Sequence, residues 1–138
     1  MLFDTNVISE LRKGPRANPR LLAWFREVPD EEIHLSVLVL GELRRGVEAI
    51  RTRDTRQAAA LERWLERLAA DHAERILPVD AAVAHEWGRL MARRAASVID
   101  TLMAATALVH GLVLVTRNVK HVDWTGVAYV NPFETTSE

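Results

Sequence analysis

Four side chains with oxygen ligands, far apart along the chain, could act together in one chemical site. They are Asp4, Glu42, Asp100 and Asn118. Hard divalent ions such as Mg²⁺ prefer carboxylate and amide oxygens, and a magnesium site needs only one or two direct carboxylates because water completes the coordination. Clustered carboxylates repel one another unless a cation lies among them. If these side chains meet, they would suit hydrolysis of a phosphodiester, in which such an ion activates water and neutralises developing charge.

Each of the four side chains also has a structural explanation. Asp4 could simply cap the helix that follows it, because Asp is a preferred N-cap residue. Asp100 stands three residues after Ser97, as in a capping box. Glu42 could be a solvated helix residue, and Asn118 could be a turn residue. Taken singly, the residues leave the choice between structural roles and a shared acidic site open.

The elements that must position these side chains alternate between strand and helix patterns. Short apolar runs predict five strands, at residues 2–3, 33–35, 76–79, 112–115 and 127–130. Helical segments between them predict a three-layer α/β/α domain with a mostly parallel five-stranded sheet. The continuous run 112–115 is typical of a central parallel strand. Pro78 places the third strand at an edge, because proline cannot donate to a ladder.

Local signals mark the ends of the predicted helices. Ser36 is a good N-cap for a helix that runs to about Ile50, and Asp80 caps a later helix. Gly111 is the expected left-handed residue after the helix that opens at Ser97. These signals fix where the helices begin and end without reference to the rest of the fold.

The predicted fold can bring the four candidate side chains to one rim of the sheet. Ligands bind at the carboxyl ends of strands in an open α/β sheet, and Asp4 and Asn118 follow two predicted strands. Glu42 and Asp100 lie near the starts of helices that pack on the sheet. Residues 37–40 are apolar on all sides, which predicts a turn buried on every side. Glu42 emerges directly beside that turn, either at its solvent edge or buried with a partner.

Length and composition exclude several other classes of protein. The 138 residues fit one domain, and we predict a single domain over 1–138 with a polar tail at 134–138. The chain has no cysteine, which excludes disulfides and thiolate chemistry and fits a reducing compartment. The longest apolar stretch, 102–115, is too short and too polar for a membrane span of about 20 residues. With no leader visible, these features predict a cytoplasmic protein without membrane contact.

Positive charge is concentrated locally rather than spread over the molecule. The formal net charge is −1, so the overall field does not attract nucleic acid. Arginines and lysines nevertheless cluster in three parts of the chain: Arg12, Lys13, Arg16 and Arg20; Arg44, Arg45, Arg51, Arg53 and Arg56; and Arg93, Arg94, Arg117 and Lys120. Arginine suits phosphate through its planar fork of donors. The alternative is that these clusters are solvated helix faces paired with acidic residues.

Four stretches resemble the successive motifs of PIN-domain ribonucleases, and most closely VapC-type toxins of the FitB-like branch. They are LFDTNVISE at 2–10, LGELRRG at 40–46, IDTLMAATA at 99–107 and VTRNV at 115–119. One such motif would be weak, but four in this order and at these spacings are specific. The resemblance is collinear and covers nearly the whole chain, down to residues 130–134.

The resemblance implies roles for individual residues. Asp4, Glu42 and Asp100 match the three acidic metal-site residues of the family, and Asn6 matches the polar residue that supports the first acid. Mg²⁺, with Mn²⁺ as the alternative, is the implied cofactor. Residues implied to hold the substrate are Asn6, Arg44, Arg117 and Lys120, and residues implied to support the site are Thr5, Ser36, His121 and Asp123.

The chain departs from the family pattern at the fourth acidic position. Many relatives have an acid just after the fourth strand, where this chain has Asn118. His121 stands where relatives often have an acid in the following turn, and Asp123 is the nearest substitute. The departure favours one tightly held ion over two, with Asn118 as the amide corner of a three-acid site.

The resemblance also implies a function and partners. It implies a metal-dependent endoribonuclease that hydrolyses RNA phosphodiester bonds as the toxin of a toxin–antitoxin pair. The toxin would form a homodimer, be neutralised by a VapB-like antitoxin and meet DNA only through that antitoxin. The apolar faces around Trp24 and Trp64 are candidate docking surfaces, with core packing as the alternative.

Two other functions remain open from the sequence. Because Asn118 and His121 replace acids, the chain could be a catalytically weak PIN-fold binding module that acts in a protein–DNA regulatory complex with its antitoxin. A structure-specific DNA nuclease of the same wider fold is less favoured, because the chain is too short to carry extra duplex-binding elements.

Overall fold

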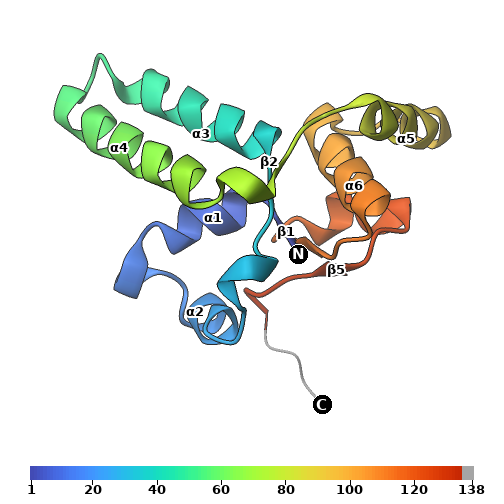
Figure 1. Ribbon diagram of the computed structural model, residues 1–138, viewed down its shortest axis with the longest axis horizontal. Coiled ribbons are helices and arrows are strands. Elements are labelled where there is room, and N and C mark those ends of the chain that lie inside the picture. Colours follow the sequence, from blue (N-terminus) through green and yellow to red (C-terminus); the bar gives the residue numbers. More distant parts are fainter. Residues whose placement is uncertain (135–138) are drawn as a thin grey trace.

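A computed structural model describes residues 1–134 of the protein, with short strands and α-helices alternating along the chain (Figure 1). The strands are β1 (Leu2–Phe3), β2 (Leu35–Ser36), β3 (Ile76–Leu77), β4 (Leu114–Val115) and β5 (Tyr129–Val130). The helices are α1 (Thr5–Leu11), α2 (Pro19–Phe25), α3 (Val37–Ile50), α4 (Thr55–Asp71), α5 (Ala81–Arg93) and α6 (Val98–His110). Short 3₁₀ turns connect several of them, including Val119–His121 and Asp123–Thr125.

Every strand pair in this part of the chain is parallel. β4 lies between β1 and β5, with Leu2 opposite Leu114 and Phe3 opposite Val115. β2 pairs with β3, and a bridge between Leu2 and His34 connects the two sheets. The amide of Phe3 donates to the carbonyl of His34 at 3.0 Å. The strands therefore lie in the order β3-β2-β1-β4-β5.

The predicted parallel sheet is confirmed, but as a three-stranded and a two-stranded sheet joined by a single bridge. β4 is central in its sheet and β3 lies at an edge, as the run 112–115 and Pro78 predicted. The strands are shorter than predicted because the chain leaves the sheet at once. Asp4 directly after β1 already caps α1, and Ser36 at the end of β2 caps α3.

Helices pack around these short strands and bury β1, β2 and β4, whereas β3 is half-buried and β5 is partly exposed. Leu2, Phe3, Leu114 and Val115 have no exposed surface. Figure 1 shows the α3–α4 hairpin and the α5–α6 pair on different sides of the central strands, with α1 and α2 below the hairpin. The middle of α6 is buried from Met103 through Ala107. This packing holds the carboxyl ends of β1 and β4 against the starts of α1, α3 and α6.

The predicted helix ends are confirmed. Asp80 accepts a hydrogen bond from the amide of Val83 at 3.0 Å, and Gly111 ends α6 in the left-handed conformation with φ 64°. The first turn of α3 is not buried on every side, because Val37 is 40% exposed while Val39 is buried. The turn lies beside β2, toward the edge of the sheet that ends at β3, so less of the fold covers it.

The two tryptophans singled out by sequence are half-buried and pack against the core. The ring of Trp24 lies 5.8 Å from the ring of Phe3, measured between centroids. Trp64 of α4 contacts both the central core and the separate α3–α4 cluster around Val47 and Leu65. Core packing therefore accounts for most of both rings.

Within residues 1–134, no helix combines the length and the apolar character that a membrane crossing requires. Of the predicted polar tail at 134–138, only Glu134 belongs to the part that the structure describes, and it is exposed.

Candidate active site

Asp4 is the most firmly held carboxylate in the site. It follows β1 directly, and its amide donates to the carbonyl of Val115 at 2.9 Å. Its Oδ1 accepts a hydrogen bond from the amide of Thr5 at 2.7 Å, which is the N-cap contact of α1. The side chain is nevertheless only 7% exposed. Asp4 is thus both the helix cap and a carboxylate buried at the rim of the sheet.

Thr116 holds the second oxygen of Asp4 and was not identified from the sequence. Its hydroxyl donates to Asp4 Oδ2 at 2.7 Å, and the Asn6 side-chain amide donates to the same oxygen at 3.3 Å. Thr116 has no exposed surface. No local sequence signal marked it, because its role follows from the pairing of Phe3 with Val115, which sets the two following residues side by side.

The loop after β4 is tied to the same group. The amide of Asn118 donates to the Thr116 hydroxyl oxygen at 3.0 Å, and the amide of Arg117 donates to Asn6 Oδ1 at 3.2 Å. The Asn6 side chain therefore connects Asp4 to the loop after β4. Both ends of its amide are used in these contacts, so Asn6 positions the site rather than binding a ligand. Asn118 is exposed, and its side chain lines the groove described below.

Glu42 lies in the second turn of α3 and is half-buried beside Asp4. Its Oε1 accepts a hydrogen bond from the Thr5 hydroxyl. Thr5 thus joins two acids, with its amide on Asp4 and its hydroxyl on Glu42. The structure therefore places Glu42 beside Asp4, where the sequence placed it.

Asp100 lies in the first turn of α6 and is half-buried. Its amide donates to the Ser97 hydroxyl at 3.4 Å, so the predicted cap exists. Its carboxylate faces the other way, with Oδ2 3.0 Å from Nδ1 of His121. His121, on the exposed 3₁₀ turn after β4, thus occupies one side of this acid.

Glu42 and Asp100 both lie close enough to Asp4 to affect its pKa. The pKa of Asp4 is raised above its ordinary value of 3.8, first because burial disfavours the charged form. The hydrogen bonds from Thr116 and Thr5 oppose this rise in pKa, and repulsion from Asp100 and Glu42 adds to it. No cationic side chain is among the causes.

Two predicted site residues, Ser36 and Arg44, have structural roles instead. Ser36 is fully buried and its hydroxyl accepts from the amide of Leu38 at 3.0 Å, so it positions the start of α3. Arg44, predicted to hold RNA, forms ion pairs with Glu62 and Glu48 on the α3–α4 hairpin. Glu48, four residues further along α3, and Glu62 of α4 therefore neutralise the charge of Arg44.

The remaining predicted residues follow β4. The guanidinium of Arg117 lies over the ring of Phe133 at 4.4 Å from the ring centre. Lys120 is exposed and lines the groove, and Asp123 is exposed at the start of the 3₁₀ turn Asp123–Thr125. Within residues 1–134, Asp123 forms no hydrogen bond or ion pair with the three acids.

The three carboxylates fit a hard divalent ion by their chemistry. A carboxylate offers roughly four acceptor positions, and Asp4 uses three of them. Glu42 Oε2 and Asp100 Oδ1 accept no hydrogen bond from the residues that the structure describes. Within that part of the chain, no three histidine, cysteine or acidic side chains lie together closely enough to hold a metal ion as they stand. The donor set therefore suits an ion held by one or two carboxylates and by water.

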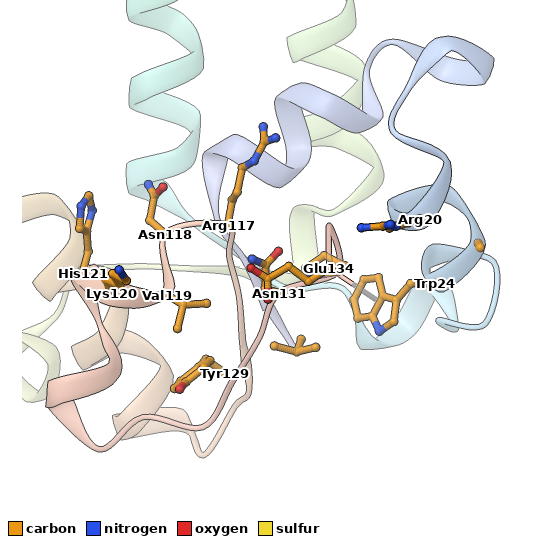
Figure 2. A pocket seen from close by; sticks show the side chains of 13 residues that line it. Arg20, Trp24, Arg117, Asn118, Val119, Lys120, His121, Tyr129, Asn131 and Glu134 are labelled. Atoms are coloured by element: carbon orange, nitrogen blue, oxygen red, sulfur yellow. The ribbon is translucent and has the colours of Figure 1, made fainter. Parts of the chain in front are cut away.

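An open groove of about 940 Å³ adjoins the acids, and we call it the β5 groove. It is lined by Arg20, Ala23 and Trp24 of α2, by residues 117–121, and by residues 129–132 and 134. Figure 2 shows His121 and Lys120 at one end, Trp24 and Arg20 at the other, and Asn131 and Glu134 between them.

Comparison with known proteins identifies the family. A family model described as PIN domain matches residues 1–123. The chain is 33% identical over 139 residues to VapC ribonuclease Y4jK of Sinorhizobium fredii, which covers 97% of this chain and 98% of the relative. It is 33% identical over 138 residues to Toxin FitB of Neisseria gonorrhoeae, covering 96% and 98%.

Solved structures agree with the sequence relatives. The crystal structure of FitAcB from Neisseria gonorrhoeae matches with a TM-score of 0.88 and 32% identity, covering 97% of this chain and 99% of that one. The structure of FitAB bound to an IR36 DNA fragment matches with a TM-score of 0.88 and 30% identity, covering 99% and 97%. The resemblance inferred from four motifs is confirmed: the chain belongs to the PIN-domain family.

Proposed function

We propose that the protein is a metal-dependent endoribonuclease that hydrolyses RNA phosphodiester bonds. The observation that carries the proposal is the buried Asp4, fixed by three side-chain or backbone donors while Glu42 and Asp100 repel its charge. A carboxylate whose pKa is raised by burial and by neighbouring acids is typical of a functional site. The relative named VapC ribonuclease, 33% identical over nearly the full chain, supports the same activity.

Asp4 and Asp100 are the residues we propose to hold Mg²⁺ or Mn²⁺, with Glu42 beside them. When bound, the ion would activate a water molecule and neutralise charge on the phosphate. The protein contributes rigidity to this group. Thr5, Asn6 and Thr116 fix both oxygens of Asp4, and Thr5 also fixes one oxygen of Glu42.

Glu42 is the candidate base for the attacking water. Thr5 holds Oε1, which leaves Oε2 to accept a proton. The water oxygen forms a bond to phosphorus, the bond from phosphorus to the leaving ribose oxygen breaks, and that oxygen takes up a proton. Asn118 and Lys120 lie on the rim next to this group and would contact the phosphate from the side of the β5 groove.

We further propose that the protein is the toxin of a toxin–antitoxin pair. The relative named Toxin FitB and the matching structures of FitAcB and of FitAB bound to DNA support a VapB-like antitoxin partner, with DNA contacted through the antitoxin. Two small clefts, of about 210 and 140 Å³, meet at Trp64 between α1, α3 and α4 and are candidate seats for an antitoxin segment. We also propose that the protein forms a homodimer and acts in the cytoplasm.

Substitution of the acids tests the proposal directly. Asp4→Asn and Asp100→Asn should each abolish cleavage of RNA in Mg²⁺ or Mn²⁺ and relieve growth inhibition, while circular dichroism shows a folded protein. Asp71→Asn, at the exposed end of α4, is the matched control and should cleave as the wild type does. Full activity in both Asp4→Asn and Asp100→Asn would overturn the assignment.

A second function is favoured by one feature of the site. Asn118 replaces an acid and His121 occupies one oxygen of Asp100, so the protein could be a catalytically weak module that acts in a DNA complex with its antitoxin. Wild-type protein that binds antitoxin and operator DNA tightly but cuts no RNA in either metal would establish this alternative. Cleavage of flap DNA in preference to RNA would instead indicate a DNA nuclease.

A further inference from the structure

The β5 groove carries positive charge that forms no ion pair within the described residues 1–134. Arg20 and Lys120 are exposed on its lining, and neither forms an ion pair within residues 1–134. Glu134 is the one acidic side chain on the lining that the structure describes. The formal net charge of the whole chain is −1, so this excess of cations is local.

The groove also offers an exposed aromatic ring. Tyr129 of β5 is 43% exposed, although the neighbouring strand residues of β1 and β4 are fully buried. Figure 2 shows Tyr129 beside Val119, on the same lining as Lys120. Cationic grooves with exposed aromatic rings bind single-stranded nucleic acid, because phosphates follow the cations and bases stack on the rings.

The groove reaches the neighbourhood of the acids through two of its lining residues, although none of the three acids lines it. Asn118 and His121 line its near end. His121 contacts Asp100, and the backbone of Asn118 is bonded to Thr116, which in turn holds Asp4. A polyanion lying in the groove would therefore end at the carboxylates.

We propose that the β5 groove binds the single-stranded RNA flank on one side of the cleaved bond. Arg20 and Lys120 hold phosphates, and Tyr129 stacks on a base. The inference rests on the proposed ribonuclease function and adds to it a positioning surface outside the acids. The charge of Arg20 and Lys120 favours a polyanion over a basic peptide as the occupant of the groove.

Binding of RNA without cleavage gives the first test. The probe is a fluorescein-labelled, unstructured 12-nucleotide RNA in EDTA, and anisotropy is measured over a range of salt concentrations. Arg20→Ala should weaken binding about fivefold and reduce the salt slope by about 0.7, the value for one phosphate contact on a single strand. Tyr129→Ala should weaken binding about tenfold with the slope unchanged, whereas Tyr129→Phe should bind as the wild type does.

Matched variants separate this effect from a general loss of charge. Arg26→Ala removes an exposed arginine from the end of the same helix, outside the groove lining, and should leave binding and slope nearly unchanged. Equal weakening by Arg26→Ala and Arg20→Ala would overturn the proposal. So would tight RNA binding by Tyr129→Ala together with loss of antitoxin binding, which would assign the groove to the antitoxin.

Substrate length gives the second test and keeps the two proposals apart. A substrate trimmed on the groove side of the cleaved bond should be cut equally by wild type and Tyr129→Ala, while the long substrate is cut more slowly by the variant through a higher KM. If no substrate is cut by any variant or by the wild type, the ribonuclease proposal fails. If long and trimmed substrates respond identically to Tyr129→Ala, only the groove proposal fails.

Discussion

Two carboxylates in this protein, Glu62 and Asp4, have opposite surroundings and opposite pKa shifts. On the α3–α4 hairpin, the pKa of Glu62 is lowered because Arg44 and Arg51 donate hydrogen bonds to it. At the rim of the sheet, the pKa of Asp4 is raised, because the group is buried and faces two further acids without a cation. The hairpin acids pair with arginines, whereas the rim acids accept hydrogen bonds but form no ion pair with a lysine or arginine within residues 1–134.

The difference distinguishes charges that pair within the fold, such as that of Glu62, from charges that the fold leaves without an opposite charge, such as that of Asp4. Exposed ion pairs such as those of Glu62 add little to stability and link one helix to another. A buried carboxylate that repels its neighbours lowers stability, and it persists where a ligand or a reaction uses it. The same contrast holds for cations, since Arg44 is neutralised on the hairpin while Arg20 stands on the β5 groove without an ion pair in residues 1–134.

Among changes that leave the rim acids in place, Thr116→Val should cause the largest effect, because it removes a hydrogen bond to Asp4 without changing the shape of the side chain. The substitution leaves Asp4 Oδ2 without its shortest bond and the amide of Asn118 without an acceptor. Loss of such an orienting contact typically lowers activity by about 10- to 100-fold, and unfolding should cost about 1–3 kcal/mol less. RNA cleavage and urea denaturation measure the two effects. Thr106→Val, which removes a buried hydroxyl within α6, is the control and should leave cleavage intact.

Mg²⁺ should stabilise the protein through the rim acids alone. An ion that binds only the folded state at 100 times its dissociation constant adds about 2.7 kcal/mol. Thermal unfolding with increasing Mg²⁺ should show this gain in the wild type and in Glu62→Gln, and not in Asp4→Asn. An equal gain in Asp4→Asn would mean that the ion binds elsewhere and that the two regions do not differ in the way described.

The parts of this contrast that were predictable from the sequence are the local ones. Helix caps at Ser36, Asp80 and Ser97 depend on neighbours two or three residues away, and Asp4 is marked by its place after an apolar run. The alternation of strand and helix patterns along the chain was enough to predict a parallel sheet. The motif resemblance then chose the acids, which local pattern alone could not distinguish from caps.

The parts that were not predictable depend on contacts between distant segments. Thr116 gains its role from the register of β1 on β4, and that register is set by packing. Arg44 was predicted to hold RNA, but α4 brings Glu62 to its guanidinium across 18 residues of sequence. Val37 is 40% exposed because the described residues 1–134 leave that side of α3 open, which the apolar pattern of the turn cannot report.

The smallest effect is a difference in the direction of pH dependence. Because the folded-state pKa of Glu62 is below its ordinary value of 4.5, its ion pairs stabilise the protein above that pH and are lost as the pH falls through the lowered pKa. The pKa of Asp4 is shifted the other way, so in EDTA its ionisation lowers stability as the pH rises from 3.8 through the raised pKa. Urea unfolding between pH 3 and 7 should therefore show a weaker acid-side loss of stability in Glu62→Gln, with cleavage unchanged. Because the hairpin pairs are exposed, that difference should shrink in 1 M salt, whereas the opposite slope due to the buried Asp4 should remain. A salt-insensitive Glu62→Gln effect, or a decrease in RNA cleavage, would show that the hairpin acids belong to the functional group after all.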